Sequence, residues 1–263
     1  MSASIEILFL GSGTSHGVPM IACECPVCTS DDPRDKRLRP SIAITLPAES
    51  PTNGRVIVVD TGPEFRISAI NQKLARVDAV LFTHGHADHI MGLDDIRRYN
   101  GLAGGTIPCY CDERTAQTIR RCFGYAIVPY ISTDRPSISV DVIDGPTNVC
   151  GCEVIPVPLK HNRMDILGFR IGSFAYCTDC SAIPESSFAL LEGLDVLVLD
   201  ALRIKPHPGH FNLDQAIEAA GRINASRTCF THIAHALGHR ETSARLPANM
   251  ALAYDGLRLS ATL

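Results

Sequence analysis

The 263-residue sequence contains no tryptophan, and aromatic residues make up only 6% of it. It also lacks an apolar run long enough to cross a bilayer, and it does not open with the basic and apolar segments of a secretory leader. Neither sign of charge dominates, because 24 Lys and Arg residues oppose 28 Asp and Glu residues for a net charge of −4. We therefore expect no membrane association, and the bulk charge does not indicate a nucleic-acid binder.

What the sequence has in excess is cysteine and histidine, with 11 and 10 residues respectively. An odd number of thiols cannot all pair within one chain, and many of them are close neighbours, so no regular disulfide framework is indicated. We expect a cytoplasmic protein whose thiols are reduced or bound to metal. A content of 45% hydrophobic and 20% charged residues is typical of a globular chain and excludes a disordered one.

Short apolar strands alternate with helical segments along the chain, which predicts an α/β fold built in layers. Strands are expected at 5–10, 41–46, 55–60, 79–82, 108–111, 152–160, 169–177, 195–199 and 227–230, and helices at 64–74, 113–122 and 213–223. Pro156 and Pro158 place the strand at 152–160 at a sheet edge. Residues 21–40 have no period and little to bury, so an irregular excursion is expected there, and 129–146 is rich in turn residues. No linker separates two cores, so we expect a single domain over residues 1–263.

The tripeptide Phe-Thr-His occurs twice at the end of a short apolar strand, at 82–84 and at 230–232. A sandwich of two similar halves would produce such an echo. Three matching residues are weak support when taken alone.

The sequence His84-Gly85-His86-Ala87-Asp88-His89 places four metal-capable side chains in six residues, directly after an apolar strand. Imidazole and carboxylate groups suit zinc, manganese or iron better than calcium. Alternate residues of an extended stretch share a side, so His84 and His86 are expected to hold one ion, while Asp88 and His89 turn towards a second. The alternative is a solvated loop that is merely rich in histidine, which four such residues in close sequence disfavour.

This motif resembles the hallmark of the metallo-β-lactamase superfamily, whose fold is an αββα sandwich of two mixed β-sheets flanked by helices. The resemblance implies that Asp60, in Asp60-Thr61-Gly62, supports the metal loop from behind. It also implies two sets of metal ligands with one shared carboxylate: His84, His86 and His161 for one ion, Asp88, His89 and His232 for the other, and Asp179 for both.

Further segments are similar to one branch of that superfamily, the cyclic-phosphate phosphodiesterases associated with bacterial phosphonate breakdown. The similar segments are residues 11–15, the cysteine loop, 86–95 and 208–212. In that branch a structural zinc is bound by three cysteines and one histidine, which here implies Cys23, Cys25, Cys28 and His235. Three thiolates and one imidazole form a closed tetrahedral set, which would fasten the inserted loop of about residues 21–40 to the far part of the chain. Free surface thiols are the alternative.

Two adjacent cations would turn a bridging water into a hydroxide nucleophile and neutralise phosphoryl oxygens. The ester leaving group then needs a proton or a positive neighbour. His210 is the candidate, because it lies in a turn just ahead of an expected helix N-terminus. The resemblance implies that Asp200 is its partner, and a histidine that only caps its helix is the alternative. His207 is less expected to act, and His16 and His239 are expected to be structural or exposed.

The eight cysteines outside the zinc loop are expected to be small core residues. Cys177-Thr178-Asp179-Cys180 has the spacing of a redox motif, but it does not open a helix after a thioredoxin-type strand. The pairs Cys109/Cys111 and Cys150/Cys152 alternate along expected strands, so each pair is expected to share a face.

We therefore expect a metal-dependent hydrolase, and first a dinuclear phosphodiesterase that acts on a small, cyclic or nucleotide-like phosphate ester. Its cofactors would be two active-site ions of manganese, zinc or iron, together with one structural zinc. One alternative is RNA processing of the transfer-RNA 3′-endonuclease type, against which the net charge and the missing basic arm argue. The others are a thioester or lactone hydrolase and a zinc protein without catalysis, although the latter would lack some ligands. A homodimer is the default expectation.

Overall fold

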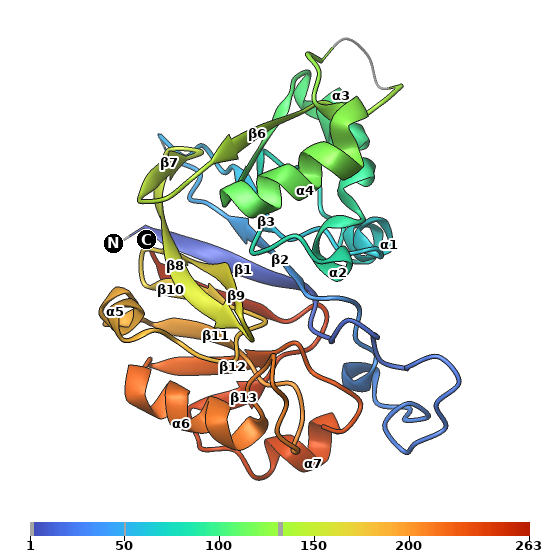
Figure 1. The fold of residues 1–263 in the computed structure, drawn as a ribbon, viewed down its shortest axis with the longest axis vertical. Coiled ribbons are helices and arrows are strands. Elements are labelled where there is room, and N and C mark those ends of the chain that lie inside the picture. Colours follow the sequence, from blue (N-terminus) through green and yellow to red (C-terminus); the bar gives the residue numbers. More distant parts are fainter. Residues whose placement is uncertain (1–2, 50, 131–133) are drawn as a thin grey trace.

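The computed structural model describes residues 3–49, 51–130 and 134–263. Two β-sheets pack face to face, and helices cover the outer face of each sheet, so that the layers follow the order helix, sheet, sheet, helix (Figure 1). This arrangement is the expected αββα sandwich. No helix among the described residues is long and apolar enough to cross a membrane.

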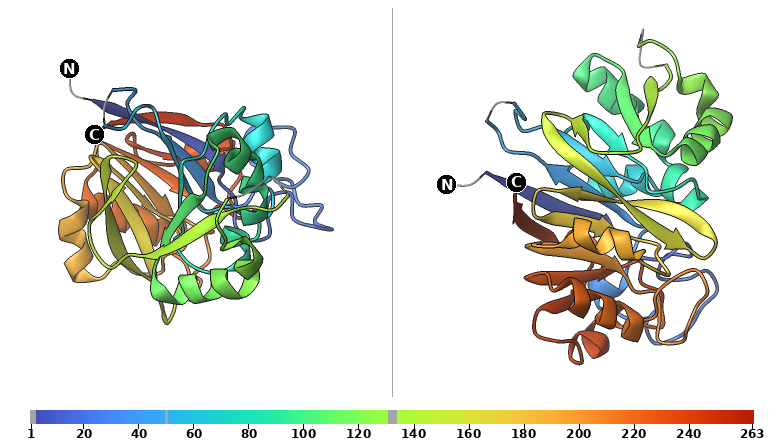
Figure 2. Two further views of the ribbon diagram at one scale, coloured as in Figure 1. Left: turned by 90° about the horizontal axis from the view of Figure 1, so that it is seen from above. Right: turned by 60° about the vertical axis from the view of Figure 1, so that its left-hand side comes forward.

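The first sheet has seven strands. In spatial order they are β14 (Arg258–Thr262), β1 (Ser4–Gly11), β2 (Ser41–Thr45), β3 (Val56–Val59), β4 (Ala79–Leu81), β5 (Ile107–Cys111) and β6 (Ile138–Val142). The second sheet also has seven, in the order β13 (Met250–Leu252), β12 (Arg227–Thr231), β11 (Val196–Asp200), β10 (Phe174–Cys177), β9 (Met164–Ile171), β8 (Cys152–His161) and β7 (Thr147–Val149). The β8–β9 hairpin runs as a long twisted ribbon in the right-hand view of Figure 2.

The helices fall into two groups that follow the order of the chain. The first sheet is covered by α1 (Phe65–Asn71), α2 (Ala87–Ile90), α3 (Arg97–Ala103) and α4 (Glu113–Phe123), and the second by α5 (Glu185–Phe188), α6 (Leu213–Ile223) and α7 (His239–Ser243). Short 3₁₀ turns are η1 (Pro33–Asp35), η2 (Leu93–Ile96), η3 (Gly124–Ala126) and η4 (Ala189–Leu191). The predicted start of α6 is confirmed by a capping box, in which Asn212 and Gln215 exchange side-chain to backbone hydrogen bonds.

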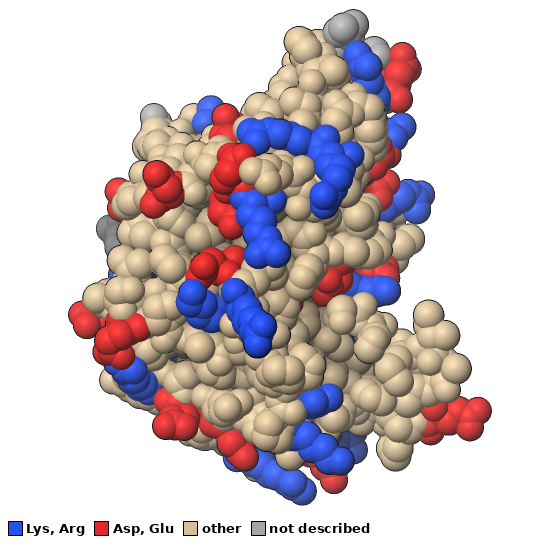
Figure 3. Space-filling model, viewed as in Figure 1, with Lys and Arg blue, Asp and Glu red and all other residues tan. Residues whose placement is uncertain are grey.

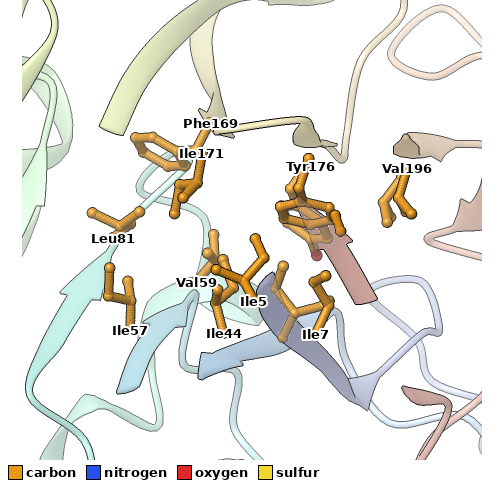
Figure 4. Packing of buried hydrophobic residues seen from close by; sticks show 14 of the residues in the cluster. Ile5, Ile7, Ile44, Ile57, Val59, Leu81, Phe169, Ile171, Tyr176 and Val196 are labelled. Carbon is orange, nitrogen blue, oxygen red and sulfur yellow. The ribbon is translucent and has the colours of Figure 1, made fainter. Parts of the chain in front are cut away.

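Alternation of side chains along the strands builds the core between the sheets. Ile5 and Ile7 of β1 and Ile44 of β2 pack against Phe169 and Tyr176 of the opposite sheet, and all five are at most 1% exposed (Figure 4). The other faces of the sheets are apolar as well, because each is covered by helices. Burial on both faces explains the nearly continuous apolar runs at 56–59 and 196–199.

The two sheets repeat one another strand for strand. From β14 to β6 in the first sheet, and from β7 to β13 in the second, three antiparallel pairings are followed by three parallel ones. In this correspondence β3 matches β10, and Asp60 follows β3 directly while Asp179 follows β10 after one residue. The two Phe-Thr-His copies lie at the ends of β4 and β12, which are not equivalent strands, so that echo does not mark the repeat.

Several predicted boundaries were wrong. The strand expected at 169–177 is two strands, because Gly172 turns the chain with a φ of +54° between β9 and β10. Strand β6 lies inside the turn-rich segment 129–146, of which residues 131–133 lie outside the described residues. Cys150 has a φ of +56° in the turn before β8, so it does not alternate with Cys152 along one strand. Pro156 and Pro158 lie at an edge, as predicted. The outer neighbour of β8 is β7, which pairs only with residues 152–154 and does not extend to the two prolines.

Candidate metal centre

Asp60 is the hub of a buried hydrogen-bond network beneath the 84–89 loop. It follows β3, and its carboxylate accepts hydrogen bonds from the backbone N–H and the hydroxyl of Thr83 at 2.9 and 2.8 Å. Its Oδ2 also lies 2.7 Å from Nδ1 of His89. The carboxylate thereby fixes the proton of His89 on Nδ1 and leaves Nε2 able to bind a cation. The predicted supporting position of Asp60 agrees with this geometry.

Two glycines let the segment after β3 approach the metal loop closely. A Cβ on Gly92 would lie 2.1 Å from the carbonyl oxygen of Gly62, and one on Gly62 would lie 2.6 Å from that of Asp88. The backbone of Thr61 bridges the same gap, because its N–H donates to the His89 carbonyl at 2.6 Å and its carbonyl accepts from Gly92 at 2.8 Å. Only glycine fits at these two crossings.

Three residues of the site share an unusual backbone conformation. The φ angles of Asp60, Asp179 and His232 are +60°, +58° and +59°, in the left-handed region that non-glycine residues rarely adopt. Each lies within two residues of a strand end, after β3, β10 and β12. Such conformations cost about 1–3 kcal/mol and concentrate at functional sites, where surrounding structure enforces them. Here the bends direct Asp179 and His232 into one ligand group and Asp60 towards Nδ1 of His89, a member of the same group.

The structure brings all seven predicted ligands of the dinuclear site together in two adjoining groups. Within each group the ligand atoms all lie within 4.8 Å of one another; the groups are His84, His86 and His161, and Asp88, His89, Asp179 and His232. They come from segments that are far apart in sequence, after β4, β8, β10 and β12.

Asp179 lies between the two groups. Its Oδ2 is 3.3 Å from Nε2 of His89 and 3.2 Å from Nε2 of His232, in its own group. The same oxygen is 3.9 Å from Nε2 of His84, in the other group. One carboxylate thus reaches both sets of imidazoles, as a shared ligand must.

The candidate helper His210 lies at the edge of this cluster. Its Nδ1 is 3.4 Å from Oδ2 of Asp200, and its ring stacks on that of His232 with centroids 4.6 Å apart. Asp200 is fully buried at the end of β11 and also accepts the backbone N–H of Phe211 at 3.0 Å. His210 is 8% exposed and also approaches the ligand atoms of His161 and Asp179, so its ring borders the metal groups themselves.

The charges of the cluster are those of a cation site. Burial lowers the pKa of His84 well below its ordinary value and also lowers that of His86, which keeps both imidazoles neutral and ready to bind a metal. At His89 burial acts in the same direction, but the carboxylates of Asp179, Asp60 and Asp88 outweigh it and raise the pKa well above its ordinary value. The acidic surroundings therefore demand positive charge at this point.

The donor set fits bound divalent ions. The buried ring nitrogens Nε2 of His89 and Nε2 of His232 have no hydrogen-bond partner in the described structure. Unpaired buried nitrogens cost free energy unless another group binds them. The described lining of the adjoining cavity, which measures about 300 Å³, contains Asp88 and Asp179 but no Lys or Arg to neutralise them. Metal cations would satisfy both the nitrogens and the carboxylates.

A second, larger cavity adjoins the first. It measures about 570 Å³ and shares Ser15, His207 and His210 with the cavity at the metal groups. Sequence reasoning missed Ser15 and Asn162 as lining residues, although Asn162 directly follows His161, and it undervalued His207, which lines both spaces. Two signals could have found them, because Ser15 lies in the segment 11–15 and Asn162 directly follows a predicted ligand. His16, expected to be structural or exposed, is exposed and lines the larger cavity.

The cysteine loop forms a separate cluster. The Sγ atoms of Cys23, Cys25 and Cys28 lie 3.2, 3.3 and 3.5 Å from Nδ1 of His235, and the four ligand atoms form one group. The backbone N–H of Cys28 faces the Cys25 sulfur and lowers the pKa of that thiol to about 6, which favours the thiolate that zinc binds. All eleven cysteines of the described structure are free.

The loop is also held by a buried ion pair that the sequence did not reveal. Residues 21–40 were expected to bury little, but Arg37 is 1% exposed and its guanidinium lies 2.9 Å from Asp35. The same guanidinium donates to the Leu237 carbonyl at 2.9 Å, and the backbone N–H of His239 donates to Asp35 at 2.8 Å. The irregular loop is therefore anchored to residues 237–239 independently of the thiols.

One short segment connects the two candidate metal sites. His232 belongs to the dinuclear group and His235 to the cysteine group, and Ile233 between them pairs with residues 12–14. Ser12 is fixed in turn by the half-buried carboxylate of Asp255, which accepts its backbone N–H at 2.9 Å and its hydroxyl at 2.8 Å. Asp255 stands outside any motif, so nothing in the sequence singled it out.

Comparison with known proteins agrees with the architecture. A family model described as the beta-lactamase superfamily domain matches residues 55–233. The solved structure of a diphosphatase from the PhnP family is 43% identical, superposes with a TM-score of 0.89, and covers 97% of both chains. The short form of human tRNase Z is 18% identical with a TM-score of 0.69 over 98% of this chain and all of the other, which is a likeness of fold.

A curated relative from Porphyromonas gingivalis, named octanoyltransferase, is 36% identical over 260 residues. The match takes in 96% of this chain but only 51% of the relative, so this chain spans about half the length of that protein.

Proposed function

This chain belongs to the metallo-β-lactamase superfamily of hydrolases, in its PhnP-like branch, and on that premise we propose that it cleaves a phosphodiester bond of a small or cyclic phosphate ester. The observation that carries the proposal is the place of Asp179, whose Oδ2 lies within 3.9 Å of imidazoles from both ligand groups. A shared carboxylate suits two adjacent cations, and paired cations are well suited to phosphoryl transfer. The similarity to a diphosphatase supports phosphate chemistry as well.

We propose that the three histidines His84, His86 and His161 hold one divalent ion, that Asp88, His89 and His232 hold the other, and that Asp179 is shared. Ions bound there would lower the pKa of a bound water and neutralise charge on the phosphoryl oxygens. Zinc, manganese and iron all accept this ligand set. The cysteine group has the composition of a closed structural zinc site.

The protein's own groups would complete the reaction around these ions. Asp60 keeps the proton of His89 on Nδ1, and the Gly209 carbonyl, 2.6 Å from Nδ1 of His161, does the same for that ring. His210, whose Nδ1 faces Asp200, would donate a proton to the oxygen of the leaving group. The larger cavity beyond His210 has room for the rest of the ester.

The proposal is tested by hydrolysis of bis-(p-nitrophenyl) phosphate by the protein loaded with Mn²⁺ or Zn²⁺. Asp179→Asn and Asp88→Asn are expected to lower kcat by about 100-fold or more, since each removes a negatively charged ligand. The matched control is Asp165→Asn, because the Asp165 side chain is 80% exposed on β9. Full activity of Asp179→Asn with unchanged metal content would overturn the dinuclear assignment.

A thioester hydrolase is the second candidate, and the name of the octanoyltransferase relative is the observation that favours it. That name belongs to a protein about twice as long, so the matched half need not act on acyl groups. A kcat/KM for octanoyl-coenzyme A above that for every phosphate ester tested would favour the thioester hydrolase. RNA is disfavoured, because on the face drawn in Figure 3 the basic side chains lie in small groups broken up by acidic ones.

The remaining expectations stay predictions. We propose that residues 1–263 act as one domain, since the ligands of both metal groups are drawn from almost the whole length of the chain. A homodimer and a cytoplasmic location are checked by light scattering and by fractionation of cells.

A further inference from the structure

A groove remote from the metal cluster opens between α1 and α3, which lie on the same outer face of the first sheet (Figure 1). It measures about 570 Å³. Its floor is apolar and contains Phe65, Ala69, Leu74 and Tyr99, and the Tyr99 hydroxyl is turned away to the Leu74 carbonyl at 3.0 Å. A volume in this range accommodates a small organic ligand.

Large apolar side chains stand at the rim of the groove without cover. Ile70 on α1 is 58% exposed and Leu102 on α3 is 54% exposed, and both line the groove. Ile67, on the same helix as Ile70, is 45% exposed. Contiguous exposed apolar surface of this kind commonly marks a binding site, whereas single exposed residues do not.

The rim is strongly cationic. Arg66, Lys73 and Arg98 line the groove, and no ion pair or hydrogen bond of their side chains is present among the residues that the structure describes. Arg97 also lines it but is already paired with Asp94, and Asp95, the single acid of the described lining, interacts electrostatically with Arg66. An excess of cations around an apolar floor complements a ligand that has a negative head and an apolar body.

The same charges argue against a second copy of this chain as the occupant. A two-fold symmetric contact places a surface patch against itself, so the unpaired cations of two grooves would face one another. Like charges brought together in this way are costly. An anionic ligand avoids that repulsion.

We propose that this groove binds an amphipathic anion, namely an unbranched aliphatic chain that ends in a carboxylate. The chain lies on Phe65, Leu74 and Tyr99 between the exposed Ile70 and Leu102, and the head group pairs with Arg98, Arg66 or Lys73. This site is independent of the phosphodiesterase proposal, because it shares no residue with either cavity at the metal cluster.

The test is isothermal titration of the full-length protein with dodecanoate below its micelle concentration. Inorganic phosphate is present throughout, so that the carboxylate does not bind at the metal centre. Dodecyltrimethylammonium has the same tail with a positive head, and acetate has the head without the tail. Dodecanoate is expected to bind at least about tenfold more tightly than either, since both the apolar floor and the cations contribute. Equal affinity for the two surfactants would overturn the proposal.

Variants locate the binding. Arg98→Glu and Leu102→Asp change exposed side chains, so folding is expected to persist, and each should weaken dodecanoate binding by about tenfold or more. Arg240→Glu, an exposed cation of α7 outside the groove, removes the same charge and should leave the affinity unchanged. Undiminished binding by Arg98→Glu and Leu102→Asp would place the ligand elsewhere and refute the site.

A second readout uses the absence of tryptophan from the chain. Leu102→Trp introduces a single indole at the rim of the groove, whose fluorescence should shift to shorter wavelength as dodecanoate covers it. An unchanged spectrum at saturating dodecanoate would contradict occupancy of the groove.

Discussion

Asp60 and Asp179 follow the matching strands β3 and β10 of the two sheets, and both have a left-handed backbone, with φ angles of +60° and +58°. Their roles differ. Asp60 is fully buried, and its oxygens contact Thr83 and His89. Asp179 instead directs its Oδ2 at three imidazoles. The repeated architecture therefore supplies one carboxylate that orients a ligand and one that is itself a candidate ligand.

Replacing Asp60 tests the orienting role. Asp60→Asn puts an NH₂ group where one oxygen now accepts a proton, so either Thr83 or His89 loses its partner. We expect the affinity of the dinuclear site for metal, or its activity, to fall by about 10- to 100-fold, as for other residues that support metal ligands. Metal titration followed by elemental analysis measures the change. Wild-type metal affinity together with wild-type kcat would show that His89 needs no such partner.

The cysteine group is tested by Cys25→Ser. The variant loses one of four candidate zinc ligands, so the metal content should fall by about one ion from a wild-type value of about three per chain. Thermal unfolding should move to lower temperature, while the Arg37–Asp35 pair keeps the loop in place. Cys122→Ser, on α4 outside both groups, is the control and should retain all the metal. Equal metal content in the two variants would contradict the zinc assignment.

Gly92→Ala tests the close packing of the metal loop on the segment after β3. The new methyl group would lie 2.1 Å from the Gly62 carbonyl oxygen, so the backbone has to shift, and we expect the free energy of unfolding to fall by about 1–3 kcal/mol. Gly221→Ala is a control of opposite sign. It lies within α6 with nothing within 4 Å of its Cβ, and should stabilise by about 0.5–1 kcal/mol. Urea unfolding separates these outcomes.

The role of His210 is tested through the leaving group. If His210 donates a proton, His210→Ala should slow hydrolysis of an ester with a poor alkoxide leaving group by about 100-fold or more, but hydrolysis of a p-nitrophenyl ester much less. Metal content should stay at the wild-type level. A loss of the same size for both esters would instead assign the ring to phosphate or metal binding, which its approach to His161 and Asp179 also permits.

Asp255 predicts a dependence of stability on pH. Burial raises its pKa from the ordinary 3.8 to about 6, although Ser12 and Leu38 donate hydrogen bonds to it. The folded state thus holds this proton more tightly than the unfolded state, so the contribution of Asp255 is most favourable below pH 4 and is lost as the pH rises to 6. Relative to Asp255→Asn, wild-type stability should fall by about 1 kcal/mol between pH 5 and pH 7. Parallel curves from urea unfolding of the two proteins would refute the shift.

Much of the candidate site could be predicted from local motifs, because its ligands either lie close together in sequence or follow apolar strands. The residues from His84 to His89 could be recognised from spacing alone. His161, Asp179 and His232 needed the resemblance, since each is isolated in sequence and is brought to the cluster only by the pairing of β8 to β12. The structure places all of them together, while their binding of metal stays a prediction.

What the sequence did not reveal depends on tertiary contacts. Arg37 reads as part of a charged, solvated stretch, yet carbonyl groups of residues 234 and 237 and the Asp35 carboxylate make its burial acceptable. Asp255 has no neighbour in sequence that marks it. The hairpin at Gly172 was missed because the apolar residues on both sides of it read as one strand.

The composition of the cysteine group has a consequence for synthesis of the chain. Cys23 and His235 are 212 positions apart, and Cys25 and Cys28 are almost as far from that histidine. A ribosome therefore exposes three thiols long before it delivers the fourth ligand, and His232 of the other group arrives only three residues earlier. The cysteine group cannot be completed before residue 235 has been made, so the three thiols need a reducing environment or a carrier of zinc until then.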